Sequence, residues 1–334
     1  MKRKGQIIIG LALILIFILM ALAAPVLAPN DPNATNLALK NAPPSAEYPL
    51  GCDQMGRCEL SRLLYGARYS MGLTIVLLEV KDLNISLTSE KSVAEHISFR
   101  LGQGEMLSIV GSSGAGKTTI CKAIMGLLGN TYRADGEILF QGEDLLDLPE
   151  RKRQTIYGKE ICLIMQNPMT AFNPSIRVGR QMEKTYLLHH GKTPRQEMQR
   201  LFAAILQKLG LEDTQRILNS YPFTLSGGML QRLMIAAALM CQPALLVADE
   251  ATTAIDACNR IGLMRELKSF CKDGMSVLFV THDLRSASVS DRILVMDRGQ
   301  IVEQGKTEQI LNTPKEDYTK YLLNACRLER REMS

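Results

Sequence analysis

The segment at residues 106–128 constrains the fold of this chain more than any other. A short apolar stretch at residues 106–110 runs directly into the sequence GSSGAGKTT, and helix-forming residues follow at 120–128. A strand, a glycine-rich turn and a helix in this order gather backbone N–H groups and the positive end of the helix around a phosphate. The segment therefore predicts an α/β domain that binds a phosphate-bearing ligand.

The glycine-rich turn matches the phosphate-binding pattern GxxxxGK[ST] in full. We expect Lys117 to reach the β- and γ-phosphates of ATP and the Thr118 hydroxyl to hold Mg²⁺. The residues expected to contact the nucleotide in this turn are Gly111, Ser112, Ser113, Gly114, Ala115, Gly116, Lys117, Thr118 and Thr119.

A second apolar strand delivers two carboxylates to its carboxyl end. The run at residues 244–248 ends in Asp249 and Glu250, and open α/β sheets bind ligands at that edge. We expect Asp249 to be the carboxylate associated with Mg²⁺ and Glu250 to polarise the water that attacks the γ-phosphate. Adjacent carboxylates can instead cap a helix, but the presence of Lys117 in the same chain favours the catalytic interpretation.

The spacing of apolar residues predicts the remaining core elements. Alternating apolar and polar residues predict strands at 78–87 and 96–101, and a short apolar run predicts another at 276–280. A helix is expected to begin at a capping box that starts with Thr193 and to end at Gly210. Because apolar strands alternate with helical patterns, we expect an α/β fold whose parallel core sheet is covered on both faces.

Charge and cysteine usage limit the classes of partner. The net charge of +5 is spread along 334 residues, so a nucleic-acid partner, which requires a clustered basic face, is not expected. The eight cysteines include no CxxC pair, which is typical of reduced, mostly buried thiols. Cys52 and Cys58 lie near each other in the sequence, and they either bind a metal, form a disulfide or remain reduced.

The N-terminal segment has the composition of a membrane anchor. Basic residues at positions 2–4 precede an uncharged apolar run at 7–28, whose roughly 22 residues are enough to span a hydrocarbon core of about 30 Å. We expect one transmembrane helix there, with a cleaved signal peptide as the alternative. A loop rich in Pro and Asn follows at 29–48, and an amphipathic segment at 60–69.

Residues 77–321 resemble the nucleotide-binding domains of ABC transporters, because further motifs occur in that family's order. The sequence LSGGMLQR at 225–232 is similar to the family signature LSGGQ and the helix after it. Gln166 matches the glutamine loop, residues 254–256 the D-loop and residues 281–283 the switch histidine. Met229 stands where the signature usually has Gln.

The resemblance implies a P-loop NTPase fold and roles for these motifs. It implies a parallel core sheet, an antiparallel β subdomain and an inserted helical subdomain at about residues 167–235. Two ATP molecules would lie at the interface of a head-to-tail dimer, with each signature facing the partner's nucleotide. Gln166 would sense Mg²⁺ and the attacking water, and His282 would hold the γ-phosphate. The further nucleotide contacts implied are Ser226, Gly227, Gly228, Gln231 and Asp256.

Other segments resemble the corresponding segments of ATPases that power importers for peptides or nickel. Their sequence is most similar to that of the nickel branch. These segments are residues 165–168, 171–174, 221–223 and 301–305. The resemblance implies an ATPase that uses ATP and Mg²⁺ to power the import of peptides or metal chelates. The implied partners are a second ABC ATPase subunit in a homodimer or heterodimer, two full-length permease subunits and an extracytoplasmic solute-binding protein.

The N-terminal part looks like the opening of the permease subunit of the same importer class. The resemblance rests on residues 48–53, 56–57 and 61–70, and covers the first span and the loop after it. We interpret the chain as a permease fragment at 1–76 joined to a complete ATP-binding domain at 77–334. A non-functional fusion remnant and a non-transport ABC ATPase are the alternatives.

The membrane topology contains a conflict. The basic residues at 2–4 place the N-terminus in the cytoplasm by the positive-inside rule, and a single span would then leave the ATPase outside. The apolar stretch at 71–78 is too short to form a second span that would bring the chain back across the membrane. Either the span inserts inverted, or it does not cross, or the chain is a remnant. Because ATP is cytoplasmic and a large folded domain resists translocation, we expect the ATPase domain on the cytoplasmic face of the cell's inner or plasma membrane.

Overall fold

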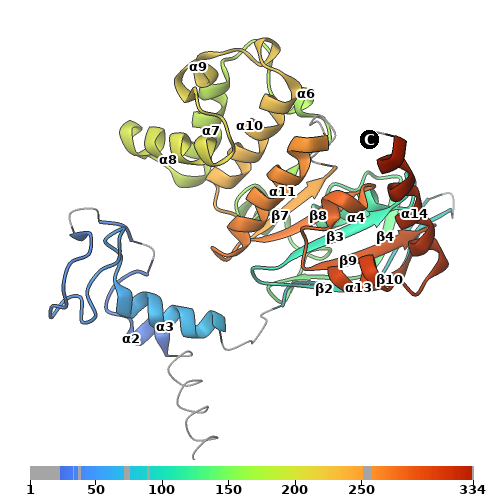
Figure 1. Cartoon of the computed structure of the whole chain (residues 1–334), viewed down its shortest axis with the longest axis horizontal. Coiled ribbons are helices and arrows are strands. Elements are labelled where there is room, and N and C mark those ends of the chain that lie inside the picture. The colour runs from blue at the N-terminus through green and yellow to red at the C-terminus, as the bar shows by residue number, and fades with distance from the viewer. Residues whose placement is uncertain are drawn as a thin grey trace, which may run out of the picture. The chain divides into compact units, whose positions relative to one another are not determined.

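The chain folds into two compact units, Met1–Ile75 and Val76–Ser334. The computed structural model describes residues 23–32, 34–36, 39–70, 76–88, 91–250 and 257–332. We call the two parts the N-terminal unit and the large unit. The large unit holds a six-stranded and a four-stranded sheet, with helices around them (Figure 1).

The six-stranded sheet is the core of the large unit. Its strands, in spatial order, are β10 (Gln300–Lys306), β9 (Arg292–Asp297), β3 (Met106–Gly111), β8 (Ser276–Thr281), β7 (Leu245–Asp249) and β6 (Ile161–Ile164). The strands from β6 to β9 pair in parallel, and only β10 pairs antiparallel to its neighbour. The predicted parallel core is therefore confirmed, with three of its strands placed to within one residue.

Alternate residues of the core strands pack on opposite faces of the sheet, as the pleat requires. Leu246 and Phe279 belong to a buried cluster with α10 and α11, whereas Val247 and Leu278 belong to a second cluster with α4 and the four-stranded sheet. These helices are α4 (Lys117–Ile124), α10 (Gly227–Met240) and α11 (Ala257–Cys271). Both faces are covered, which explains why the core strands read as continuous apolar runs.

The smaller sheet is antiparallel throughout. Its strands, in spatial order, are β2 (Ser92–Gly102), β1 (Val76–Leu87), β4 (Tyr132–Phe140) and β5 (Glu143–Asp144). The strand predicted at 96–101 begins four residues earlier than expected. His96 has a φ of 52° and Asp82, opposite this region, has a φ of 44°, so the β1–β2 register shifts there and the alternation pattern is interrupted.

A helical part follows β6. It comprises α6 (Pro168–Ala171), α7 (Val178–His190), α8 (Arg195–Lys208), α9 (Thr214–Asn219), a 3₁₀ turn at Pro222–Thr224 and α10. The predicted apolar face of α8 is confirmed, since Met198 and Phe202 are buried. The predicted capping box at Thr193 is wrong, because extended Pro194 (ψ 131°) is the N-cap and no side chain caps the helix.

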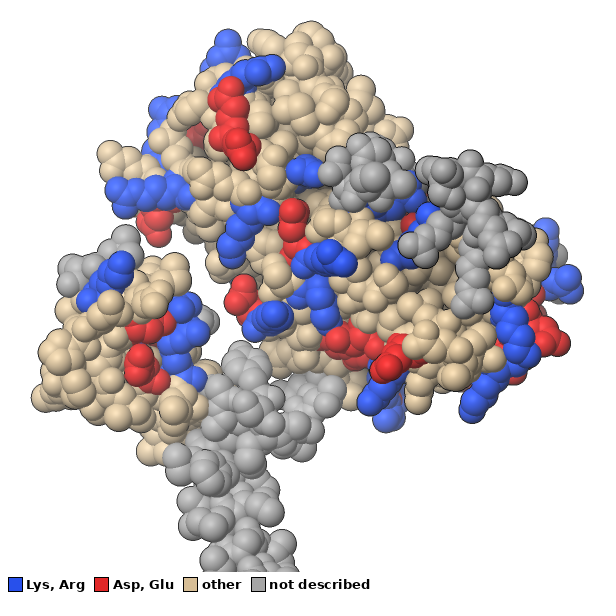
Figure 2. Space-filling view, in the orientation of Figure 1, with Lys and Arg blue, Asp and Glu red and all other residues tan. Residues whose placement is uncertain are grey.

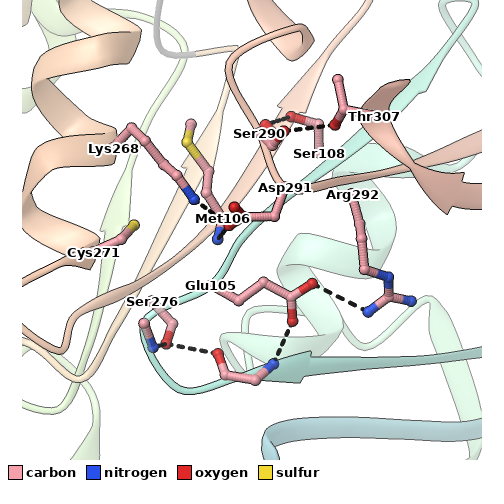
Figure 3. A network of polar contacts seen from close by, with 12 residues as sticks. Glu105, Met106, Ser108, Lys268, Cys271, Ser276, Ser290, Asp291, Arg292 and Thr307 are labelled. Carbon is pink, nitrogen blue, oxygen red and sulfur yellow. Dashed lines mark hydrogen bonds and ion pairs between the residues drawn. The ribbon is translucent and has the colours of Figure 1, made fainter. Parts of the chain in front are cut away.

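A polar network at the amino ends of the core strands connects distant segments (Figure 3). The Asp291 carboxylate accepts a hydrogen bond from Met106 N (2.8 Å) and forms an ion pair with Lys268 of α11. Glu105 accepts from Gly102 N (2.7 Å) and from Arg292 (3.2 Å). These contacts fix β3 against β9 and α11 at the edge opposite the glycine-rich turn.

Three helices form the C-terminal part: α12 (Leu284–Ala287), α13 (Thr307–Asn312) and α14 (Asp317–Glu332). The carboxylate of Glu303, on β10, accepts hydrogen bonds from the backbone N–H groups of Lys315 (2.9 Å) and Glu316 (3.2 Å). These bonds fix where α14 begins. On the face drawn in Figure 2, Lys and Arg are interspersed with Asp and Glu.

The N-terminal unit contains α2 (Ala24–Leu27) and α3 (Glu59–Ser70). The amphipathic segment predicted at 60–69 forms α3. Most of the span predicted at 7–28 lies outside the described residues. Within the described part of the chain, no helix has the length and apolar character needed to cross a membrane.

Candidate active site

The glycine-rich turn lies between β3 and α4, as the sequence predicted, and its backbone requires glycine. A Cβ on Gly111 would lie 2.2 Å from the Met296 carbonyl oxygen, and one on Gly116 would lie 2.8 Å from the Val93 carbonyl oxygen. Gly116 also has a φ of 94° and is the N-cap of α4, so the loop turns sharply into the helix. A glycine-rich loop that turns directly into a helix N-terminus offers backbone N–H groups to an anion.

Lys117 curls over this loop. Its ammonium donates hydrogen bonds to the carbonyl oxygens of Gly111 (2.8 Å) and Ser112 (2.7 Å), and the residue is buried. Burial lowers the pKa of Lys117, and the carboxylates of Glu250 and Asp249 oppose this effect. A buried ammonium in a loop of N–H donors fits an anionic, phosphate-bearing ligand, because an anion would compensate the desolvated charge.

Four neighbouring strands bring the other predicted site residues to the same edge. In the order β3, β8, β7, β6, the strands end at the glycine-rich turn, His282, the Asp249–Glu250 pair and Gln166. Because these strands are parallel, their carboxyl ends lie together, and ligands of such sheets bind there. The sheet order therefore assembles residues that are far apart in the sequence.

Glu250 is the centre of the polar contacts at this edge. Its carboxylate accepts a hydrogen bond from the Gln166 side-chain amide through Oε2, and Oε1 lies 3.3 Å from His282 Nδ1. Its backbone N–H donates to the Val280 carbonyl (2.9 Å), and its φ of 47° is in the left-handed region. Such a conformation is costly for a residue other than glycine and clusters at functional sites.

Asp249 and Thr118 form a second pair of oxygen ligands beside Glu250. The Thr118 hydroxyl donates to Asp249 Oδ1 at 3.1 Å. Burial raises the pKa of Asp249, the neighbouring Glu250 charge adds to this rise, and the Thr118 hydrogen bond opposes it. A hydroxyl and a carboxylate, both hard oxygen donors, are the ligand types that Mg²⁺ prefers.

The signature residues lie in the helical part. Ser226 is the N-cap of α10, and its hydroxyl accepts a hydrogen bond from Met229 N–H (3.3 Å). Figure 1 shows α10 among α6–α9, whereas α4 lies on the strand layers. Gln231 departs from its predicted role: it is fully buried, and among the residues that the structure describes its side-chain amide has no hydrogen-bond partner, so its side chain is not presented to a nucleotide. Asp256 lies outside the described residues.

One contact to the phosphate loop was not predicted. The Tyr318 hydroxyl, on α14, accepts a hydrogen bond from the backbone N–H of Ser112 at 3.0 Å. The two residues are 206 positions apart, and no periodic pattern reveals such a pair. The nearest sequence signal was the importer-like stretch at residues 301–305, which ends 13 residues before Tyr318.

The fold and this edge define a P-loop nucleotide-binding domain of the ATP-hydrolysing class. Residues 94–253 match the ABC transporter family, and residues 2–44 match the N-terminal TM domain of oligopeptide transport permease C. The chain belongs to the ABC transporter family as an ATP-binding subunit. The residues that match the family, 94–253, lie within its large unit.

Named relatives align with most of the large unit. The chain is 40% identical to the metal-staphylopine import system ATP-binding protein CntD of Staphylococcus aureus, over 75% of this chain and 93% of the relative. It is 41% identical to the oligopeptide transport ATP-binding protein OppD of Bacillus subtilis, over 74% of this chain and 71% of the relative.

A solved structure shares the fold. The dimeric, post-hydrolysis ATP-binding cassette MJ0796, bound to ADP and Pi, is 27% identical with a TM-score of 0.62, covering 69% of this chain and 98% of that chain. The alignment supports the arrangement of two sheets and a helical part described above.

Proposed function

We propose that this chain hydrolyses Mg²⁺-bound ATP at the edge formed by β3, β8, β7 and β6, and so powers an importer. The observation that carries the proposal is the Glu250 carboxylate, held between Gln166 and His282 beside the phosphate loop. Two side chains orient this carboxylate, as a general base requires. Lys117 and the loop N–H groups bind the phosphates.

The proposed division of labour follows from the contacts. Glu250 orients the attacking water and takes up its proton at a carboxylate oxygen, and His282 binds the γ-phosphate. Thr118, Asp249 and Gln166 would hold Mg²⁺, which when bound neutralises charge on the phosphates. A cation there would also favour the ionised form of Asp249, whose pKa burial otherwise raises.

The complete site requires a second ATPase subunit. Ser226 is the N-cap of α10, and Gly227 and Gly228 are its first residues. Because α10 lies among the helices of the helical part whereas α4, which follows the phosphate loop, lies on the strand layers (Figure 1), we propose that these residues face the nucleotide of a partner. The dimeric form of MJ0796 supports this arrangement. Asp256, six residues after Glu250 in the sequence, is proposed to lie at the same interface.

Permease subunits are the second kind of partner that we propose. Large apolar side chains are exposed near Gln166 and the signature, namely Met165, Met169 and Phe223, with Phe223 66% exposed. We propose that these side chains belong to the surface that contacts the permease. The relatives named for metal-staphylopine import and oligopeptide transport support an importer. We propose that it receives its solute from an extracytoplasmic binding protein.

A transport experiment tests the importer function. We favour a metal chelate over a peptide as solute, so deletion of the gene should lower uptake of labelled chelated nickel several-fold and uptake of a labelled tripeptide much less. The wild-type gene should restore uptake and a Glu250→Gln gene should not. Loss of peptide uptake alone would reject the metal preference, and loss of neither would reject the importer.

We also propose that the large unit lies on the cytoplasmic face of the inner or plasma membrane, because its substrate ATP is there. Protease added to spheroplasts should leave the large unit intact, and lysis should make the same sites cleavable. Cleavage of the large unit in intact spheroplasts would show that the chain exports its own ATPase and cannot supply the importer with energy.

A further inference from the structure

Cys52 and Cys58 face each other across a short antiparallel bridge in the N-terminal unit. Two backbone hydrogen bonds flank the pair: Asp53 N to Arg57 O (3.0 Å) and Glu59 N to Gly51 O (3.0 Å). This pattern makes the cysteines a non-hydrogen-bonded pair, in which the Cα atoms lie about 4.5 Å apart and the side chains leave from the same face. A disulfide joins Cα atoms about 4.4–6.8 Å apart, so the backbone is already in range.

The turn between the cysteines is held in place by one carboxylate. Asp53 Oδ1 accepts hydrogen bonds from the backbone N–H groups of Met55 (2.8 Å) and Arg57 (3.0 Å), and Oδ2 accepts from Arg57 Nε (2.8 Å). Gly56 has a φ of 70°, and a Cβ there would lie 1.7 Å from the Asn36 carbonyl oxygen. The hairpin therefore presents the two thiols to each other without backbone movement.

The surroundings of the pair distinguish its two thiols. Cys52 is 5% exposed and Cys58 is 1% exposed. Burial alone would raise the pKa of Cys58, but hydrogen bonds from Ser61, Asn30 and the backbone of Leu60 bring it below its ordinary value. Burial and the nearby Cys58 raise the pKa of Cys52. Cys58, immediately before α3, is thus the thiol that ionises more readily.

A metal site fits this pair less well than a disulfide does. Two thiolates supply half of the ligands of a closed tetrahedral zinc site. Across the described residues, no group of three or more His, Cys, Asp and Glu side chains could hold a metal ion. The antiparallel bridge between the two cysteines instead has the geometry of a disulfide.

We propose that Cys52 and Cys58 form an intramolecular disulfide that closes the hairpin at residues 52–58. The reaction is exchange with an external disulfide such as oxidised glutathione. The Cys58 thiolate attacks one sulfur and releases one glutathione thiolate. The Cys52 thiol, losing its proton to solvent, then attacks the Cys58 sulfur and releases the second. The two cysteines lose two electrons and two protons, and oxidised glutathione becomes two reduced glutathione molecules.

Peptide mapping of the full chain tests the proposal, because Arg57 places a trypsin site between the two cysteines. The reduced chain, purified in detergent, is treated with oxidised glutathione, denatured in N-ethylmaleimide and digested. We expect residues 41–57 and 58–62 as one linked species, two hydrogens lighter than the separate peptides, which reduction divides. Burial raises the pKa of Cys271 to about 11, so this thiol stays protonated, should be recovered in the alkylated form and serves as the internal control.

Two single variants distinguish the Cys52–Cys58 disulfide from other oxidation products of the two cysteines. Cys52→Ser should leave glutathione attached to Cys58, and Cys58→Ser should react more slowly at Cys52. Recovery of both peptides alkylated, under conditions in which the half-buried Cys326 takes up glutathione, would overturn the proposal. A disulfide-linked dimer on a non-reducing gel in place of the linked peptide would overturn it as well.

Discussion

Glu250→Gln is expected to lower the ATP turnover of the purified full-length chain by about 10²–10⁴-fold while ATP binding is retained, because a positioned general base contributes about that much. The substitution is close to isosteric and keeps the side-chain volume and the left-handed backbone at φ 47°. What it removes is the negative charge that Gln166 and His282 orient. Phosphate release at saturating Mg²⁺-ATP gives the turnover, and a labelled ATP analogue gives the binding.

A matched control shows whether the loss of turnover depends on where the Glu→Gln substitution is made. Glu212→Gln makes the same chemical change at an exposed position after α8, and its turnover should equal that of the original chain. If Glu250→Gln also keeps full turnover, Glu250 is not the base. If both variants lose turnover equally, the effect is on the preparation and the catalytic assignment has no support.

Much of the fold could be predicted because local patterns and tertiary packing agree. Residues 245–249 and 276–281 form buried strands whose alternate side chains belong to two different clusters. A short, continuous apolar run is typical of such a strand, because both of its faces are covered. The glycine-rich turn was equally clear, since a Cβ on Gly111 would meet a backbone oxygen 2.2 Å away. Where sequence and packing require the same residue type, the pattern is informative.

The missed features depend on contacts between distant segments. Gln231 is buried because α10 packs against the core sheet. The signature motif alone does not predict how its helix packs. The φ of Glu250 is set by its hydrogen bond to Val280 on the adjacent strand β8. The capping box predicted at Thr193 failed for a local reason instead: Pro194 stays extended, so the helix begins one residue later than the motif requires.

Lys117→Ala weakens ATP binding by about 10- to 100-fold or more, because a hydrogen bond to a charged group contributes about 1.5–3 kcal/mol. Lys117 is the buried cation of the phosphate loop, and alanine supplies neither its charge nor its donors. Equilibrium binding of a fluorescent ATP analogue measures the loss. Lys122→Ala, at an exposed position of the same helix α4, is the matched control and should bind with unchanged affinity.

The same binding assay tests whether the C-terminal helix supports the phosphate loop. Tyr318→Phe keeps the ring and removes the hydroxyl that accepts from Ser112 N–H, so the loop loses one neutral hydrogen bond, a contribution of about 0.5–1.5 kcal/mol. Glu303 fixes the start of α14 through Lys315 and Glu316, so the rest of the helix should stay in place. We expect ATP affinity to fall about two- to tenfold with turnover at saturation unchanged, since the substitution leaves Glu250 and its contacts with Gln166 and His282 in place. A higher ATP affinity in Tyr318→Phe would contradict this role and show that the hydroxyl competes with the nucleotide for the loop.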